Sequence, residues 1–161
     1  MPQIHDSSAL LKNALILVES CKVLDAPVIV TEQYPEGIGP MVAALMPALD
    51  QCQKISKKTF SCCREPLFMS ALKATGRNQV IITGIETHVC VFQTAADLLQ
   101  NGYAVQVAAD AVGSRTINNK ETGLNRMRRL GVEITSVESV VFELLETSAC
   151  PEFKQILRLI R

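Results

Sequence analysis

Short apolar runs that alternate with amphipathic segments constrain the fold of this chain more than any other feature of its sequence. Between residues 79 and 135, the pattern predicts strands over 79–83, 104–109 and 132–135, separated by helices over 88–100 and 118–130. Strands and helices that alternate in this way are typical of a parallel sheet covered by helices on both faces. We therefore expect an α/β chain with a three-layer α/β/α architecture and a mostly parallel, doubly wound sheet.

The rest of the chain carries weaker signals of the same kind. They predict helices over 8–25, 41–48, 65–75, 137–146 and 151–160, and strands over 27–31 and 53–57. The polar run Asp6-Ser7-Ser8 can cap the first helix, and Thr135 with Glu138 has capping-box spacing before the helix at 137–146. With 161 residues, of which 48% are hydrophobic, we expect a single domain over residues 1–161.

Composition and charge exclude several classes of partner. Sixteen basic and sixteen acidic residues give a formal net charge of zero, so the chain lacks the electrostatic footprint of a nucleic-acid or membrane-surface protein. No apolar stretch reaches the roughly 20 residues of a membrane span, and the first residues do not resemble a signal peptide. We expect a cytoplasmic protein that binds a small-molecule substrate.

The six cysteines are irregularly spaced, which favours reduced thiols over a disulfide framework. The vicinal pair Cys62 and Cys63 suggests redox chemistry, but a disulfide between neighbours is strained, and we expect ordinary loop or core residues there. The chain has only two histidines and no CxxC pair. We therefore predict no bound metal and no cofactor.

Cys90 is the best candidate for chemistry. An apolar strand pattern ends at Gly84, and a helical pattern begins within a few residues, which places the thiol at a helix N-terminus where unpaired N–H groups favour an anion. A free cysteine taken alone is more often a small buried hydrophobic residue, and this context favours a nucleophile. His88 lies about 200° away around a regular helix, so we expect it to be a polar wall or a cap rather than the base.

These residues belong to a set of motifs distributed over most of the chain. The set comprises 84–91 (GIETHVCV), 93–98 (QTAADL), 102–107 (GYAVQV), 110–114 (DAVGS), 28–35 (VIVTEQYP) and 57–61 (KKTFS). Together the motifs resemble the isochorismatase-like cysteine hydrolases, in particular the branch of isochorismatase domain-containing proteins.

The resemblance implies hydrolysis through an Asp-Lys-Cys triad. Cys90 matches the nucleophile, and Lys57, three residues before Phe60, matches the lysine better than Lys58 does. A cation close to the sulfur would lower the pKa of the thiol and stabilise the thiolate. The remaining role, which is acid–base catalysis and activation of the hydrolytic water, belongs to an aspartate in this family.

The resemblance also implies the surroundings of the nucleophile. The oxyanion hole would consist of the backbone N–H groups of Glu86 and Cys90, with a cis peptide between Ile85 and Glu86. Candidate pocket residues are Glu32, Tyr34, Phe60 and His88. Amidase members such as nicotinamidases place metal ligands on the loop after the second family strand. Here the corresponding residues 31–36 (TEQYPE) lack that Asp and His set, which argues against a nicotinamidase.

One departure from the family pattern concerns the triad aspartate. It lies in an apolar-Asp-x-Gln strand before the first helix, and the residues that precede our predicted helix at 8–25 contain no such strand; Asp6 lacks its context. We expect a sheet without this middle strand, completed by a segment further upstream in a longer chain, or by subunit exchange or rearrangement in a shortened relative. Open strand edges favour a homo-oligomer.

Two interpretations of function therefore stand side by side. The first is a cysteine hydrolase that acts on a small carbonyl or amide substrate. The alternative is a catalytically impaired or inactive family member that acts as an oligomeric binding or scaffold protein.

Overall fold

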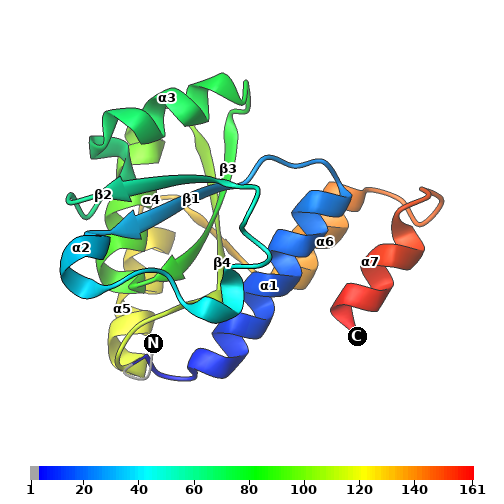
Figure 1. Cartoon of the computed structure of the whole chain (residues 1–161), viewed down its shortest axis with the longest axis horizontal. Helices are drawn as coiled ribbons and strands as arrows, with labels where there is room; N and C mark the ends of the chain where they lie inside the picture. Colours follow the sequence, from blue (N-terminus) through cyan, green and yellow to red (C-terminus); the bar gives the residue numbers. More distant parts are fainter. Residues whose placement is uncertain (1–3) are drawn as a thin grey trace.

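Five parallel strands form the centre of the computed structural model, which describes residues 4–161. β1 (Ile29–Gln33) pairs with β2 (Gln53–Lys57), while β3 (Gln79–Ile85), β4 (Ala104–Gly113) and β5 (Glu133–Thr135) pair in that order. Every pair is parallel, which confirms the predicted α/β class. The strands form two separate sheets, so within the described residues one edge of β1 and one edge of β3 have no strand partner (Figure 1).

Seven α-helices and three 3-10 or π-helical turns connect and cover the strands in the described part of the chain. The helices are α1 (Ser7–Val23), α2 (Pro35–Ile38), α3 (Pro66–Ala74), α4 (Phe92–Gln100), α5 (Ile117–Arg129), α6 (Val137–Leu145) and α7 (Phe153–Ile160). Two turns are 3-10 helices, η1 (Ala43–Leu45) and η2 (Cys62–Arg64), and η3 (Thr87–Val91) is a π-helical turn that leads into α4.

The predicted helix over 41–48 is wrong: only η1 forms there. Pro47 lies inside the predicted segment and has no N–H group to donate to the carbonyl of Ala43, so the hydrogen-bond series of a regular helix is interrupted there and turns follow η1. The loop before η1 contains the short helix α2, which the turn-rich sequence did not indicate.

Two predicted helix caps also differ. Asp6 precedes α1 with a left-handed backbone (φ 49°), and its side chain makes no capping hydrogen bond. At α6 the cap is Ser136 rather than Thr135, because Thr135 still belongs to β5. The Ser136 hydroxyl accepts a hydrogen bond from the backbone N–H of Ser139 at 3.2 Å.

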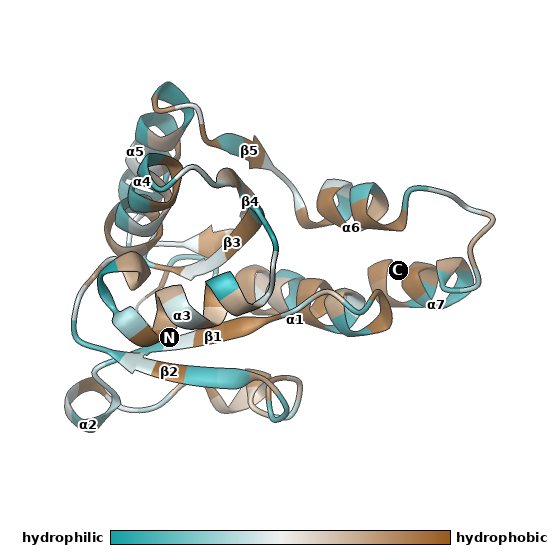
Figure 2. Cartoon of the chain, turned by 90° about the horizontal axis from the view of Figure 1, so that it is seen from above, coloured by the Kyte–Doolittle hydropathy of each residue, from teal (hydrophilic) through white to brown (hydrophobic). Residues whose placement is uncertain are grey.

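Two apolar cores on opposite faces of the strands produce the three layers. On one face, α3, α4 and α5 pack with Phe68, Leu98 and Met127 against β4. On the other face, α1, α6 and α7 pack together against Ala108 and Ala111 of the same strand. Figure 1 shows α1, α6 and α7 grouped on one side of the molecule, and in Figure 2 much of α5 has the hydrophilic colour that its solvent-facing residues require.

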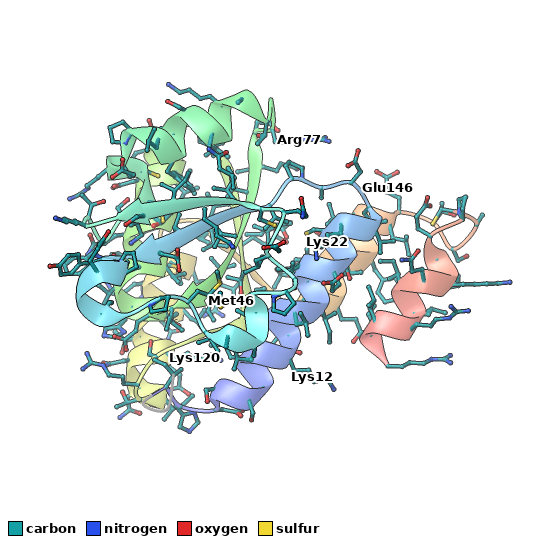
Figure 3. The ribbon with its side chains drawn as sticks, in the orientation of Figure 1. Lys12, Lys22, Met46, Arg77, Lys120 and Glu146 are labelled. Carbon is teal, nitrogen blue, oxygen red and sulfur yellow. The ribbon has the colours of Figure 1, made fainter. Side chains whose placement is uncertain are left out.

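Most charged side chains lie on the outside of this fold. In Figure 3 the labelled side chains of Lys12 and Arg77 project from the surface, and both residues are exposed. Among the described residues, no helix combines the length and the apolar character needed to cross a bilayer. Among the lysines and arginines of residues 4–161, Lys57 is the exception because it is buried.

Candidate active site

The candidate site lies where parallel strands end. Gln33 ends β1 and Lys57 ends β2, and the two residues are direct partners in the strand register. β3 ends at Ile85, immediately before the turn that carries Cys90. In open α/β sheets, ligands bind beyond the carboxyl ends of the strands, so these ends are the expected place for a site.

Lys57 is held in a fixed position. Its side chain is 4% exposed, and its ammonium donates hydrogen bonds to the side-chain oxygen of Gln33 and to the carbonyl oxygens of Thr59 (2.9 Å) and Phe60 (3.0 Å). All three acceptors are neutral, and no carboxylate of residues 4–161 forms an ion pair with Lys57. Lys58 is exposed instead and lies 5.2 Å from the centre of the Tyr34 ring.

The turn that carries Cys90 is irregular. Gly84 has a φ of 111°, the peptide bond between Ile85 and Glu86 is cis, and η3 follows at once. The Glu86 carbonyl accepts hydrogen bonds from the N–H groups of Val89 (3.1 Å) and Val91 (3.2 Å). Gly123 of α5 packs directly against this turn, since a Cβ atom there would lie 2.9 Å from the backbone of His88.

Cys90 is partly buried, and its environment acts on the thiol in both directions. Burial raises the pKa of the Cys90 thiol above its ordinary value, and this effect outweighs the opposing Lys57 ammonium. The Cys62 thiol also raises the pKa, whereas the nearby backbone N–H of Glu86 lowers it. Lys57 therefore lowers the pKa as expected, but burial outweighs it, because sequence motifs identify the cation and not the degree of desolvation.

The two polar residues beside Cys90 have partners of their own. The Glu86 carboxylate accepts hydrogen bonds from the backbone N–H (3.0 Å) and the side chain (3.2 Å) of Arg115. Nδ1 of His88 lies 3.1 Å from the hydroxyl of Ser114. Both contacts connect the turn to the segment that follows β4.

Of the candidate pocket residues, only Tyr34 lines the cavity beside Lys57. The cavity has a volume of about 540 Å³ and is lined by Tyr34, Glu36, Ser56, Lys57, Lys58, Thr59 and Glu65. It reaches Lys57 but not Cys90. Glu32 accepts a hydrogen bond from the backbone N–H of Met41 at 2.9 Å, and Phe60 is 54% exposed. The candidate pocket residues therefore do not form one pocket within the described part of the chain.

Sequence reasoning missed two residues that the fold brings to this region. Gln33 accepts a hydrogen bond from Lys57, and the signal that could have identified it is its position at the end of a strand parallel to the one that ends at Lys57. Cys62 is buried, with its sulfur 3.5 Å from the hydroxyl of Thr31 and its backbone N–H donating to Thr94 at 3.0 Å. No local pattern signals this position.

The chain is similar to known proteins over most of its length. A model of the isochorismatase domain matches residues 1–139. The chain is similar to isochorismatase domain-containing protein 2 of Danio rerio, with 38% identity over 160 residues, which cover 99% of this chain and 80% of that protein.

Solved structures agree with this similarity. The MAR1 ribonuclease of Caenorhabditis elegans has a TM-score of 0.93 at 35% identity, covering 99% of this chain and 82% of that one. YcaC from Pseudomonas aeruginosa, solved with hexane-2,5-diol and covalent acrylamide, has a TM-score of 0.89 at 28% identity, covering 97% and 80%.

Proposed function

Because the chain belongs to the isochorismatase domain family of hydrolases, we propose that it hydrolyses a small carbonyl or amide substrate with Cys90 as the nucleophile. The observation that carries this proposal is the buried Lys57 ammonium at the end of β2, which lowers the pKa of the Cys90 thiol. Since its three hydrogen-bond acceptors are neutral, its charge is available to an anion that forms at the sulfur.

In this mechanism the Cys90 sulfur attacks the carbonyl carbon, and the carbonyl oxygen becomes an oxyanion. The backbone N–H groups of Glu86 and Cys90 are assigned to stabilise that oxyanion. Collapse of the tetrahedral intermediate expels the amine or alcohol, which takes up the proton that the Cys90 thiol lost on attack, and leaves a thioester on Cys90. Water then attacks the thioester and releases the carboxylic acid and the free thiol.

The raised pKa of Cys90 assigns a specific task to Lys57. Since the thiol is mostly protonated at neutral pH, the proton must leave as the sulfur attacks, and Lys57 stabilises the thiolate that forms. Glu86 is not assigned as the base, because its carboxylate is bound to Arg115. The raised pKa is also the observation that favours the alternative, an inactive family member that binds ligands or partners as a homo-oligomer.

A small molecule is a better candidate for the substrate than RNA. The Caenorhabditis elegans relative is described as a ribonuclease, but this chain has equal numbers of basic and acidic residues and a formal net charge of zero. Proteins that bind nucleic acid gain most of their affinity from neutralising phosphates with an excess of lysine and arginine.

A homo-oligomer is part of this proposal. The apolar side chains of Ile38 and Leu67 are 72% and 64% exposed. Strand β1, which also belongs to the first half of the sequence, has one unpaired edge within the described residues. Exposed apolar side chains and open strand edges both favour association. Light scattering coupled to size-exclusion chromatography should give a mass that is a multiple of 17.6 kDa. A monomeric mass at all protein concentrations would remove this part of the proposal.

The test of the hydrolase is turnover of a panel of small amides and esters, together with the rate at which acrylamide alkylates each cysteine. Cys90→Ala should abolish turnover, and Lys57→Met should slow it about 10²-fold or more, as expected for a lost electrostatic contact at the reacting atoms. Cys150→Ala and Lys54→Met are the matched controls and should retain parental rates, because Lys54 is an exposed lysine of β2 outside the cavity.

Two outcomes separate the alternatives. Parental turnover in Cys90→Ala would show that Cys90 is not the nucleophile. If the parent protein hydrolyses nothing in the panel and acrylamide modifies Cys90 no faster than Cys150, the inactive family member is the correct interpretation.

A further inference from the structure

A second thiol lies beside Cys90, and the mechanism above does not use it. Cys62 is buried, it contributes to the raised pKa of Cys90, and its sulfur faces the hydroxyl of Thr31 on β1. A buried thiol that interacts with a candidate nucleophile needs an explanation beyond core packing, because such a pair can also react.

The positions of the two thiols follow from one helix. Cys90 lies in η3 and Thr94 in α4, and the residues Val91 and Phe92 between them have right-handed helical backbone angles. Residues four apart in such a segment are neighbours on its surface, with Cβ atoms roughly 5–6 Å apart in a regular helix. The Thr94 hydroxyl accepts a hydrogen bond from the backbone N–H of Cys62 at 3.0 Å, which anchors Cys62 one turn from Cys90. Lys57 anchors the same loop from its other end, through its hydrogen bond to the carbonyl of Phe60.

The neighbouring Cys63 points toward the opposite end of that helix. Its sulfur lies 3.8 Å from the carbonyl oxygen of Thr94, which faces the following turn. Burial and the Asp97 carboxylate raise the pKa of the Cys63 thiol to about 11. Cys62 is therefore the thiol on the Cys90 side of Thr94, and Cys63 is the thiol on the Asp97 side.

We propose that Cys62 is a resolving cysteine for Cys90, so that a hydroperoxide converts the two thiols into a Cys62–Cys90 disulfide that protects Cys90 from irreversible oxidation. This inference requires a reactive Cys90 thiol, as the proposed function does, but it does not require turnover of any amide or ester.

The chemistry balances with a hydroperoxide as the oxidant. The Cys90 thiolate attacks the distal peroxide oxygen, the O–O bond breaks, and an alcohol (water, in the case of hydrogen peroxide) leaves with a proton, which produces Cys90 sulfenic acid. The Cys62 sulfur then attacks the sulfenic sulfur, forms the S–S bond, and releases water. Two thiols are oxidised, one peroxide is reduced, and a small dithiol such as dithiothreitol reverses the reaction.

To test this, the full chain is oxidised with a small excess of hydrogen peroxide, the remaining thiols are blocked with N-ethylmaleimide, and the tryptic peptides are mapped by mass spectrometry. Cleavage places Cys62 and Cys63 together in residues 59–64 and places Cys90 in residues 78–115. We expect these two peptides to be joined, both in the parent protein and in Cys63→Ser, where Cys62 is the only thiol left in the shorter peptide.

Cys62→Ser provides the second measurement. Without a resolving thiol, Cys90 should accumulate as sulfinic and sulfonic acid at least fivefold faster, and dithiothreitol should restore far less of the Cys90 thiol than in the parent or in Cys63→Ser. Cys62→Ala and a circular dichroism spectrum check that the effect does not come from loss of the fold.

The proposal is overturned by either of two results. One is a Cys62–Cys63 disulfide, or no disulfide, in an oxidised parent protein whose Cys90 has been consumed. The other is equal over-oxidation of Cys90 in Cys62→Ser and in the parent. If Cys90 reacts with neither peroxide nor acrylamide, the proposed function is rejected as well, because it requires a reactive Cys90 thiol. If Cys90 reacts but forms no crosslink with Cys62, only the role of Cys62 as a resolving cysteine is rejected.

Discussion

Substitution of Gly123 by alanine tests how α5 supports the turn that carries Cys90. Gly123 is buried in α5, and an added Cβ atom would lie 2.9 Å from the Cα and N atoms of His88 and from the carbonyl carbon of Thr87. These neighbours are backbone atoms, so they cannot rotate away as a side chain would. Either α5 or η3 must move, and a movement of η3 displaces the Cys90 sulfur from Lys57.

The expected change in stability is the difference between two opposing effects. Alanine in a helix interior is more favourable than glycine by about 0.8–1 kcal/mol. Overpacking against a rigid neighbour costs roughly 1–3 kcal/mol. The net result is a destabilisation of about 1 kcal/mol, which corresponds to a melting temperature lower by about 2–4 °C for a chain of this size.

Urea unfolding and the alkylation rate of Cys90 together measure this effect. Thr122→Ala is the matched control, because Thr122 immediately precedes Gly123 in α5 and is exposed, so the substitution should stabilise the helix slightly without touching η3. We expect Gly123→Ala to lower the free energy of unfolding and to change the alkylation rate of Cys90, and Thr122→Ala to do neither. If Gly123→Ala stabilises the protein by the full helix-propensity difference and leaves Cys90 alkylation unchanged, then α5 does not press on this turn and the packing argument is refuted.

Three further perturbations test separate features of the structure. Lys57→Met removes the charge that lowers the pKa of Cys90, so the pH profile of Cys90 alkylation should move to higher pH. Substitution of the exposed Lys58 by methionine should leave the profile in place. An unmoved profile in Lys57→Met would show that Lys57 and Cys90 do not interact. Burial, with a contribution from Cys52, raises the pKa of the Cys21 thiol from 9.0 to about 11, so the unfolded chain releases this proton first and the protein loses stability as the pH rises from 9 to 11. Two pKa units correspond to about 2.7 kcal/mol, and chemical unfolding should show a shallower alkaline loss in Cys21→Ala than in the parent; identical slopes would contradict the burial argument. Ser136→Ala removes the hydroxyl that caps α6 and should lower the free energy of unfolding by about 1 kcal/mol, with Ser136→Asp restoring most of it; equal stabilities of all three proteins would show that the cap contributes nothing.

Local pattern was sufficient to predict most of the elements. Strand β2 lies at the residues predicted for it, and helix α5 begins and ends within one residue of its predicted range. These segments were predictable because the period of apolar residues reports which backbone conformation places them on one buried face. The predicted helix at 41–48 failed because the pattern of Ala, Leu and Met there was weighed without the hydrogen-bond donor that Pro47 lacks.

By itself, the sequence determined the α/β class, the parallel strands, the position of Cys90 after a strand and a glycine, and the family resemblance that singled out Lys57. The tertiary structure alone decided that the strands form two sheets, that Lys57 is surrounded by neutral acceptors, and that the backbone N–H of Cys62 is bound to Thr94, four residues after Cys90. It also decided the sign of the Cys90 pKa shift. The physical reason is range. Secondary structure follows from neighbours within a few residues, whereas the long-range contacts that decide burial and electrostatics at this site join groups 24 to 33 residues apart along the chain, which meet only after folding.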